Sequence, residues 1–347
     1  MRAVGRVFRA DRGDAGQRLD VVLQRHLADR PDASRTRIQE WIRAGAVSLS
    51  GEIASRAAAR VASDAEIIAR LPELPSRRAP GAEDRALDVL YEDDVVMAVN
   101  KPPGLVVHPS HGHASGTLLN ALLWHARAWP AGTRPSLVHR LDKLTSGVLL
   151  AAKTRAVHAQ LARAMREGRV EKDYLALVLG RVAPARGEIA LPLARDPLDR
   201  RRVIVVERGG RACSTRYERL VATRGRQAGL ALLRCRLMTG RMHQIRVHLA
   251  AAGWPIVGDP VYGRRALPGL ADPALDAVVV GFARQALHAC RIAFDRPADG
   301  RRIEVVAPVP GDMAALLAAA GLEHDLTKGR AGRASPPAGG GGRPEQG

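Results

Sequence analysis

The sequence HRLDKLTSG, residues 139–147, runs directly into the apolar sequence VLLAA, residues 148–152. An unbroken apolar run of this length is typical of a strand that is buried on both faces. The nonamer before it is expected to form a charged loop at the end of that strand, where a rigid sheet can hold functional groups. Asp142 stands between cationic neighbours, which favour its ionised form and so its use as a nucleophile or base. Taken alone, an aspartate in this setting is more often a structural ion-pair partner.

The sequence around this stretch mixes strand-like and helix-like segments without regular alternation. Strand patterns cover residues 95–99, 174–179 and 230–237, and helix patterns cover residues 157–165 and 242–252. A doubly wound parallel fold would alternate strands and helices regularly. We therefore expect an α+β domain over residues 87–322 with a mixed, largely antiparallel central sheet.

A smaller α/β unit is expected before it, over residues 16–75. Leu19, Val22, Leu23 and Leu27 have the spacing of one helical face, and Ser34 can cap a second helix that ends at Gly45. Strand-like residues follow at 47–49 and 67–68. Residues 76–86 resemble a flexible linker, and the glycine-rich residues 323–347 are expected to be a disordered tail.

The chain is strongly basic. Its 54 lysines and arginines exceed its 35 aspartates and glutamates by 54 − 35 = 19 charges. Residues 1–75 contribute 13 − 10 = +3, so +16 lies in the larger part of the chain. Such a surface attracts polyanions, and nucleic acid is the first partner to consider, although an arginine-rich proteome produces the same bias.

Several classes of protein and site are not indicated. Three cysteines without paired spacing favour a reducing compartment, and no apolar run is long enough to span a membrane, so we expect a cytoplasmic protein without a membrane partner. No phosphate-binding glycine loop implies a nucleotide cofactor. His108, His111 and His113 suggest zinc, but no cysteine or carboxylate stands at ligand spacing nearby, and we expect no metal.

The nonamer closely resembles the signature His-Arg-Leu-Asp-x-x-Thr-Ser-Gly of the RluA-type family of RNA pseudouridine synthases, and three further segments resemble motifs of that family in the same order. These segments are residues 100–104 (NKPPG) with the pair at 108–109, residues 172–174 (KDY) and residues 240–249 (GRMHQIRVHL). The resemblance implies the pseudouridine synthase fold and an isomerase that needs no cofactor. Residues 258–263 and 284–289 also resemble family segments, and we expect them to be architectural.

The resemblance also implies roles for single residues. Asp142 would be the catalytic aspartate, Tyr174 the aromatic residue that stacks on the target base, and Arg246 the arginine that pairs with the aspartate. A guanidinium at 246 could hold that carboxylate through two hydrogen bonds. On a helix, His243 and Arg246 would share a face. We expect His243, Lys101 and Arg140 to contact RNA, with Arg140 filling the space that the extruded uridine leaves.

The smaller unit resembles the S4 RNA-binding domain through residues 18–20 (RLD) and 34–38 (SRTRI). Arg35 and Arg37 are its candidate RNA contacts, although their spacing equally fits a solvated helix face. In this family, an S4 domain ahead of the catalytic domain implies large-subunit ribosomal RNA as the substrate. We expect a monomer that acts on RNA and not on DNA.

Two other functions remain open. In a non-catalytic RNA-binding or ribosome-assembly factor, Asp142 would only brace its loop. In an RNA glycosidase, the same first bond would break and free uracil would be released. Within the isomerase hypothesis, Asp142 could attack the sugar, attack the base or abstract a sugar proton.

Overall fold

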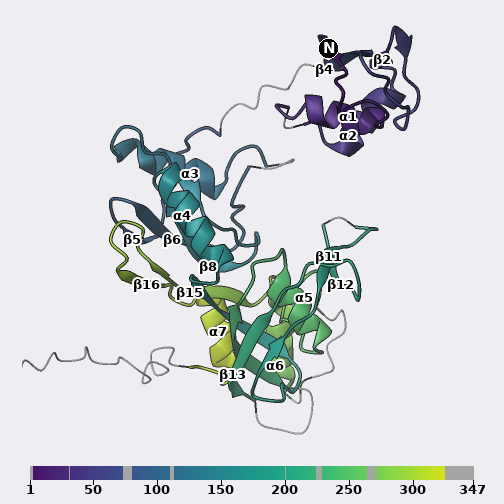
Figure 1. Ribbon diagram of the computed structural model, residues 1–347. Coiled ribbons are helices and arrows are strands. Elements are labelled where there is room, and N and C mark those ends of the chain that lie inside the picture. The colour runs from purple at the N-terminus through teal and green to yellow at the C-terminus, as the bar shows by residue number, and fades with distance from the viewer. Residues whose placement is uncertain are drawn as a thin grey trace, which may run out of the picture. The chain divides into compact units, whose positions relative to one another are not determined.

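The computed structural model describes residues 3–30, 32–72, 80–109, 113–199, 201–223, 229–263, 270 and 272–324. The chain divides into two compact units, Met1–Ala79 and Pro80–Gly347 (Figure 1). Residues 76–79 of the expected linker and 325–347 of the expected tail lie outside the described residues. Within the described ranges, no helix combines the length and the apolar character needed to cross a bilayer.

The N-terminal unit is a four-stranded antiparallel sheet with two helices. The strand order is β1-β4-β2-β3. The elements are β1 (Ala3–Arg9), α1 (Leu19–His26), α2 (Arg35–Arg43), β2 (Val47–Leu49), β3 (Glu52–Ile53) and β4 (Glu66–Pro72). Strand β1 precedes the expected start of this unit at Gly16 and pairs with β4 along its whole length. The arginines of this segment interrupt the alternation of polar and apolar residues that indicates a strand. Only the pairing with β4 shows which face of β1 is buried.

The two helices of this unit form where the sequence predicts them. The Ser34 side chain accepts a hydrogen bond from the backbone N–H of Arg37 at 3.3 Å, which is the expected N-cap. The apolar face of each helix is buried in one core, to which Leu19, Leu23 and Ile38 belong. The cap and the apolar spacing together account for both helices.

The second unit is built on a ten-stranded sheet. The main path is β10-β13-β14-β9-β15-β8-β6-β5, with β16 beside β15 and β7 beside β8. Its strands are β5 (Val89–Glu92), β6 (Val96–Lys101), β7 (Ser136–Leu137), β8 (Ser146–Ala152), β9 (Glu171–Leu179), β10 (Arg186–Ile189), β13 (Thr215–Ala222), β14 (Leu230–Leu237), β15 (Leu287–Asp295) and β16 (Arg302–Val306). A separate hairpin joins β11 (Leu193–Arg195) and β12 (Val203–Val205). The β8–β15 pair is parallel and the other pairs in the ten-stranded sheet are antiparallel, so the expected mixed, largely antiparallel α+β fold is confirmed.

Strand β8, the apolar run after the nonamer, is buried on both faces. Val148 and Leu150 pack into a core with Val157 and Leu161 of α4. Leu149 and the other alternate side chains of the strand enter a second core on the opposite face. The helices of this unit are α3 (Leu118–His125), α4 (Arg155–Arg166), α5 (Gln244–Ala251), α6 (Pro273–Gly281) and α7 (Gly311–Ala319), with a short 3-10 turn at Ala126–Ala128. An unbroken apolar sequence therefore reflects helix-bearing layers on both sides of the sheet.

The parallel contact between β8 and β15 explains the glycine at the end of the nonamer. Gly147 lies opposite Ala289 and has a φ of +112°, which side chains rarely tolerate. A Cβ atom there would lie 2.1 Å from the carbonyl oxygen of Ala289. Only glycine lets the two strands approach this closely.

We expect Gly147→Ala to lower the free energy of unfolding by more than about 3 kcal/mol, because it combines backbone strain with a clash against a fixed carbonyl. Urea unfolding measures this loss. Gly116→Ala is the matched control, since Gly116 also has a positive φ (+69°) but open space around its Cβ position. It should lose about 1–2 kcal/mol. Equal losses in the two variants would contradict the steric explanation.

Candidate functional site

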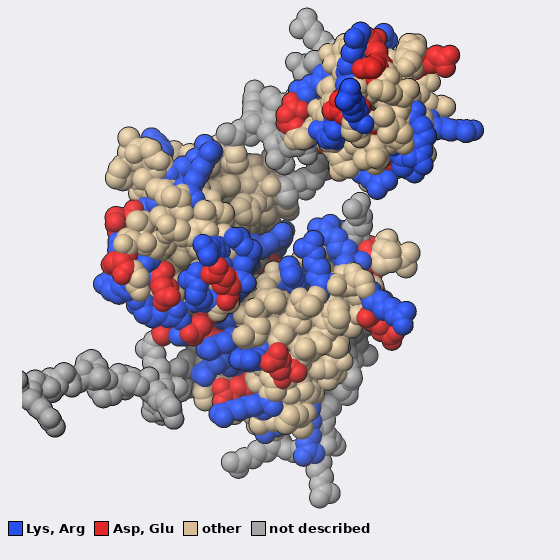
Figure 2. All heavy atoms as spheres, in the orientation of Figure 1, with Lys and Arg blue, Asp and Glu red and all other residues tan. Residues whose placement is uncertain are grey.

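The second unit contains a pocket with a volume of about 550 Å³ next to the nonamer loop. The loop, α4, β9 and the residues that lead into α5 supply its walls. In Figure 2, lysine and arginine side chains lie on both sides of a hollow in this unit. The pocket brings together five residues that the sequence singled out: Arg140, Asp142, Tyr174, His243 and Arg246.

Asp142 presents a carboxylate that is reachable from this pocket. Its side chain is 19% exposed, whereas the preceding Leu141 is buried and anchors the loop. One carboxylate oxygen accepts a hydrogen bond from Nη1 of Arg246 at 2.9 Å. The other oxygen lies 3.9 Å from Nε2 of His243. A charged oxygen held by a single guanidinium N–H keeps lone pairs available for chemistry.

Arg246 is held mainly by a second carboxylate, Asp259. Its Nε and Nη2 atoms donate to the two oxygens of Asp259 at 2.7 and 2.9 Å, so the expected two-bond contact with Asp142 is wrong. Asp142 accepts a hydrogen bond only from the remaining nitrogen of the guanidinium, Nη1. Burial alone would lower the pKa of Arg246, but the hydrogen bonds and charge of Asp259 outweigh it and raise that pKa. Arg246 is therefore a fixed cation aimed at Asp142.

Asp259 is the functional residue that the sequence reasoning missed. Burial tends to raise the pKa of its carboxyl group, but the hydrogen bonds from Arg246 prevail and lower it. Its Oδ1 atom also accepts the backbone N–H groups of Val261 and Tyr262. The Tyr262 ring lies under the guanidinium, with its centroid 5.0 Å from Cζ of Arg246. The sequence predicts an architectural role for the segment 258–263, and no local feature of it shows that its aspartate faces Arg246.

His243 lies in the pocket, but not on the helix face that the spacing predicted. Helix α5 begins at Gln244, and His243 is its N-cap residue with a left-handed φ of +55°. Its Nδ1 atom lies 2.9 Å from the hydroxyl of Tyr262, which itself accepts the backbone N–H of Val203 at 2.8 Å. The phenol can donate its hydrogen to Nδ1, which leaves the ring proton on Nε2, the nitrogen nearest Asp142. Burial lowers the pKa of His243, although the charge of Asp142 opposes this.

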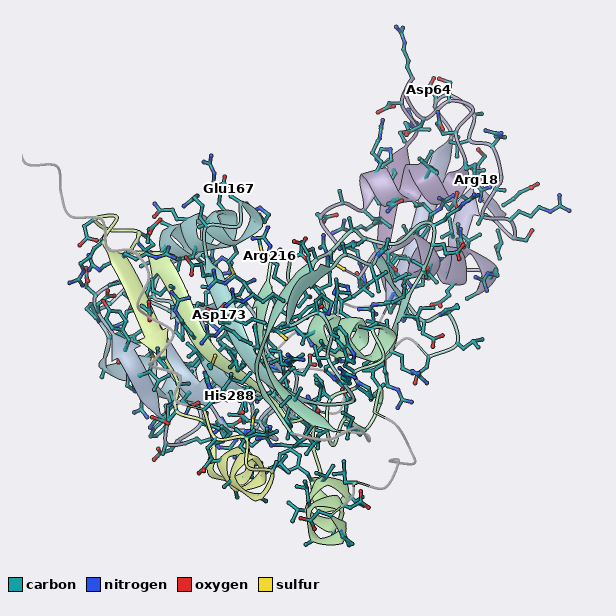
Figure 3. The ribbon with its side chains drawn as sticks, turned by 90° about the horizontal axis from the view of Figure 1, so that it is seen from below. Arg18, Asp64, Glu167, Asp173, Arg216 and His288 are labelled. Carbon is teal, nitrogen blue, oxygen red and sulfur yellow. The ribbon has the colours of Figure 1, made fainter. Side chains whose placement is uncertain are left out.

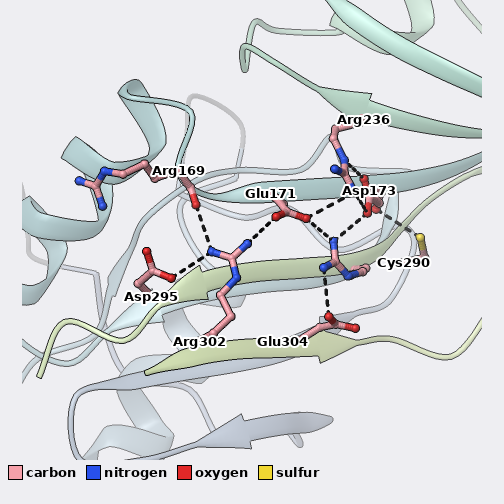
Figure 4. A network of polar contacts seen from close by, with 9 residues as sticks. Arg169, Glu171, Asp173, Arg236, Cys290, Asp295, Arg302 and Glu304 are labelled. Carbon is pink, nitrogen blue, oxygen red and sulfur yellow. Dashed lines mark hydrogen bonds and ion pairs between the residues drawn. The ribbon is translucent and has the colours of Figure 1, made fainter. Parts of the chain in front are cut away.

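Tyr174 points into the pocket because successive side chains of β9 lie on opposite faces of the sheet. Lys172 and Tyr174 line the pocket, whereas Glu171 and Asp173 belong to an ion-pair network (Figure 4). Asp173 accepts two hydrogen bonds from Arg236 at 2.7 and 2.9 Å and a third from Arg291 at 2.9 Å. These contacts join β9 to β14 and β15 and fix its register. Burial raises the pKa of Tyr174, so the phenol stays protonated.

Lys101 is fully buried, so the prediction that it contacts RNA is wrong. The residue has no exposed surface, and Nζ donates to the carbonyls of Pro102, Leu105 and Lys143 at 2.7, 3.0 and 3.0 Å. Burial lowers its pKa to about 7. The side chain fastens the 102–105 turn to the nonamer loop. Charge made it a candidate for binding RNA, but the neighbouring carbonyls decide its role.

The end of the nonamer is anchored by the segment 284–289. Thr145 Oγ1 accepts from Gln285 at 3.1 Å, and Ser146 Oγ lies 3.0 Å from Nδ1 of His288. His288 has no exposed surface and lies within the unit's interior (Figure 3). At its other side, Nε2 lies 3.3 Å from the carbonyl oxygen of Ala307 and must donate to it. His288 is therefore a neutral ring that accepts the Ser146 hydroxyl at Nδ1.

This histidine gives the protein an acid-sensitive contact. Burial lowers the pKa of His288 from 6.5 to about 4. In the unfolded chain the histidine takes up a proton below pH 6.5, whereas in the folded protein His288 stays neutral until about pH 4. The stability that comes from the neutral buried ring is therefore lost as the pH falls from 6.5 to about 4. The slope is up to about 1.4 kcal/mol per pH unit. Urea unfolding of wild type and His288→Gln at several pH values measures it, and their stability difference should narrow below pH 6.5. A difference that is independent of pH would contradict the neutral buried ring.

The remaining predicted RNA contacts lie on exposed surfaces. Arg140 is exposed at the pocket. Arg35 and Arg37 belong to α2 of the N-terminal unit, and each side chain is 54% exposed. Arg35 reaches Asp20 at 3.3 Å and Arg37 reaches Glu40 at 2.9 Å. The structure leaves both guanidinium groups accessible, and their contact with RNA stays a prediction.

Among the described residues, one cluster has the spacing of metal ligands, and it lies outside the pocket. It consists of Asp11, Asp14 and His26 in the N-terminal unit, and Arg25 already donates to both aspartates. Of the three histidines considered for zinc, His111 lies outside the described residues. His108 and His113 belong to no metal-like group in the described part of the chain.

Comparison with known proteins gives consistent results over most of the chain. Residues 95–251 match the model of a family described as RNA pseudouridylate synthase. A protein of Neisseria meningitidis named ribosomal large subunit pseudouridine synthase D is 40% identical over 312 residues, which cover 90% of this chain and 81% of that protein. A protein of the same name from Nitrosomonas europaea is 41% identical over 308 residues, covering 88% and 85%.

Two solved human structures have a similar fold. RNA pseudouridylate synthase domain containing 4 aligns with a TM-score of 0.56 and 24% identity, covering 68% of this chain and 94% of that one. RNA pseudouridylate synthase domain containing 1 aligns with a TM-score of 0.53 and 26% identity, covering 70% and 90%.

Proposed function

This chain belongs to the RNA pseudouridylate synthase family, and we propose that it isomerises uridine to pseudouridine in large-subunit ribosomal RNA with Asp142 as the reacting carboxylate. The observation that carries this proposal is the pocket in which Asp142 faces one arm of Arg246 while Asp259 holds the other two. The relatives at about 40% identity bear the name of a ribosomal large-subunit enzyme, which supports this choice of substrate.

The reaction needs an everted base, because the bonds that change lie within a stacked nucleotide. Extruding the uridine costs a few kcal/mol of unstacking. Tyr174 at the pocket wall would return about 1–3 kcal/mol by stacking on the base, and exposed Arg140 would fill the space left in the RNA. The basic surface of this unit would hold the phosphates.

Within the pocket, Asp142 promotes cleavage of the bond between C1′ and N1. It attacks the sugar, attacks the base or takes a sugar proton. The freed base rotates in the pocket, C5 bonds to C1′, the proton on C5 is lost and N1 gains a proton. Product and substrate have the same atoms, so the reaction needs no net oxidant or reductant, and we propose that it uses no cofactor or metal. Arg246 keeps the carboxylate charged and aimed.

The N-terminal unit would serve as the S4-like RNA-binding domain, with Arg35 and Arg37 as phosphate contacts. We propose that the domains are residues 16–75 and 87–322, that the protein acts as a monomer in the cytoplasm, and that RNA and not DNA is its substrate. In the structure the N-terminal fold also includes β1, from Ala3.

Incubation of the purified protein with transcribed large-subunit ribosomal RNA tests this function. We expect pseudouridine to form in the presence of a metal chelator, and mapping of the product to show one or a few sites. Release of free uracil would indicate a glycosidase instead. RNA binding without any modification would favour a non-catalytic assembly factor.

A further inference from the structure

The β11–β12 hairpin stands out from the body of the second unit (Figure 1). Its strands are only three residues long, but backbone hydrogen bonds continue beyond them. The backbone N–H of Asp196 donates to the carbonyl oxygen of Arg202 at 3.1 Å. The backbone N–H of Arg202 donates to the carbonyl oxygen of Asp199 at 2.8 Å. These hydrogen bonds continue the pairing of the hairpin beyond its two strands.

The base of the hairpin is attached to the helix that carries Arg246. Leu193 and Val203 share a small apolar cluster with Val247 of α5. The N–H of Val203 donates to the Tyr262 hydroxyl, which contacts His243 in the pocket. On the hairpin itself, Arg202 lies with Cζ 6.0 Å from the centroid of the Tyr262 ring. The hairpin is thus joined to the pocket through Val247 and Tyr262, which adjoin the pocket residues Arg246 and His243.

Leu198 occupies the tip of this hairpin and is 96% exposed. Its backbone is ordered by the Asp196 side chain, whose Oδ1 accepts the N–H groups of Leu198 at 2.9 Å and Asp199 at 3.4 Å. Pro197 restricts the backbone further. A leucine side chain that is almost fully exposed gains no free energy from burial, and the hydrogen bonds to Asp196 fix the backbone that carries this one.

The residues around Leu198 are basic. Residues 195–202 contain four arginines and two aspartates, which give 4 − 2 = +2. Both aspartates are engaged within the turn, since Asp199 also accepts from the backbone and side chain of Arg201 at 3.0 and 3.1 Å. Arg201 nevertheless remains 92% exposed. An exposed apolar side chain in a segment of net positive charge is suited to contact stacked bases that are flanked by phosphates.

We propose that Leu198 is a wedge that inserts between stacked bases of the substrate RNA, beside the nucleotide that enters the pocket. Successive residues of a strand advance about 3.3 Å, so the tip reaches up to about 16 Å from the base of the hairpin. That reach spans the neighbouring part of an RNA stem. By holding two adjacent bases apart, Leu198 lowers the free-energy cost of extruding the target uridine. The protein would therefore favour folded RNA as its substrate. This inference rests on the proposed function.

The experiment compares two substrates that share the mapped target uridine: a folded ribosomal RNA fragment and a short unstructured oligonucleotide. Leu198→Ser is expected to reduce kcat/KM on the folded fragment on the order of tenfold, because a leucine loses its buried contact with bases. Activity on the oligonucleotide should change less than about twofold, because it has no stack to open. Leu198→Met should retain most activity on both RNAs. Val280→Ser is the matched control, since Val280 is 64% exposed on α6 and does not line the pocket.

Each of the following results would overturn the wedge. Unchanged activity of Leu198→Ser on folded RNA excludes it, and an equal loss on both substrates indicates a disturbed pocket instead. A loss seen only with ribosomal particles, and not with naked RNA, indicates a protein partner for the hairpin. If the wild type forms no pseudouridine in either RNA, the proposed function fails and the wedge with it. An active wild type with an unaffected Leu198→Ser variant refutes the wedge alone.

Discussion

Asp142→Asn is expected to abolish pseudouridine formation, with a loss on the order of 10⁴-fold or more, while RNA binding and folding persist. Asparagine has the same shape and can still accept the hydrogen bond from Nη1 of Arg246. It has no charge to stabilise a bond-breaking step as a nucleophile or base. Pseudouridine mapping after a long incubation measures the residual rate, and a filter-binding titration measures RNA affinity.

Asp299→Asn is the control for this experiment. Asp299 is an exposed carboxylate of the same unit that pairs with Arg296 and lies outside the pocket. Its replacement removes the same charge and should leave turnover unchanged. Turnover at the wild-type rate in Asp142→Asn would refute the assignment of Asp142 and would restore the reading in which it only braces its loop.

Asp259→Asn is expected to cause the second largest change, although Asp259 makes no hydrogen bond to Asp142. Its carboxylate and Arg246 form a buried pair, and removing one charge of such a pair leaves the other uncompensated. We expect the free energy of unfolding to fall by about 3 kcal/mol. Because Arg246 then loses the contact that aims it, kcat should also fall, on the order of 10²-fold.

The measurements are urea unfolding and single-turnover kinetics at a temperature where the variant is folded. Glu167→Gln is the matched control, since Glu167 at the C-cap of α4 forms exposed pairs with Arg163 and Arg169, and their loss should affect stability little. Asp259→Glu keeps the charge and should recover part of the stability. A kcat that survives intact in folded Asp259→Asn would show that Asp142 and Tyr262 orient Arg246 without the second carboxylate.

Local patterns predicted several of the elements, and the family resemblance predicted five residues of the pocket. The apolar run after the nonamer predicted β8, and the spacing around Ser34 predicted α2. The resemblance of four segments placed Asp142, Tyr174 and Arg246 in one site, and all three line the pocket. These predictions succeed because burial pattern, caps and short motifs are properties of neighbouring residues.

The contacts of charged residues could not be predicted in the same way. Lys101 was expected at the RNA surface and is buried among carbonyls, while His243 was expected on α5 and precedes it in a left-handed conformation. Strand β1 was missed because its partner β4 lies about 60 residues later in the chain. In each case the deciding neighbour comes from a distant segment.

The sequence by itself determined that this protein is an α+β enzyme of the pseudouridine synthase type with a carboxylate in a loop before a buried strand. Only the tertiary structure decided how that carboxylate is held. Arg246 lies 104 residues from Asp142 in the chain and divides its guanidinium between Asp142 and Asp259. The strength and direction of an ion pair depend on distance, burial and competing partners, and these quantities exist only once the strands and α5 have packed together.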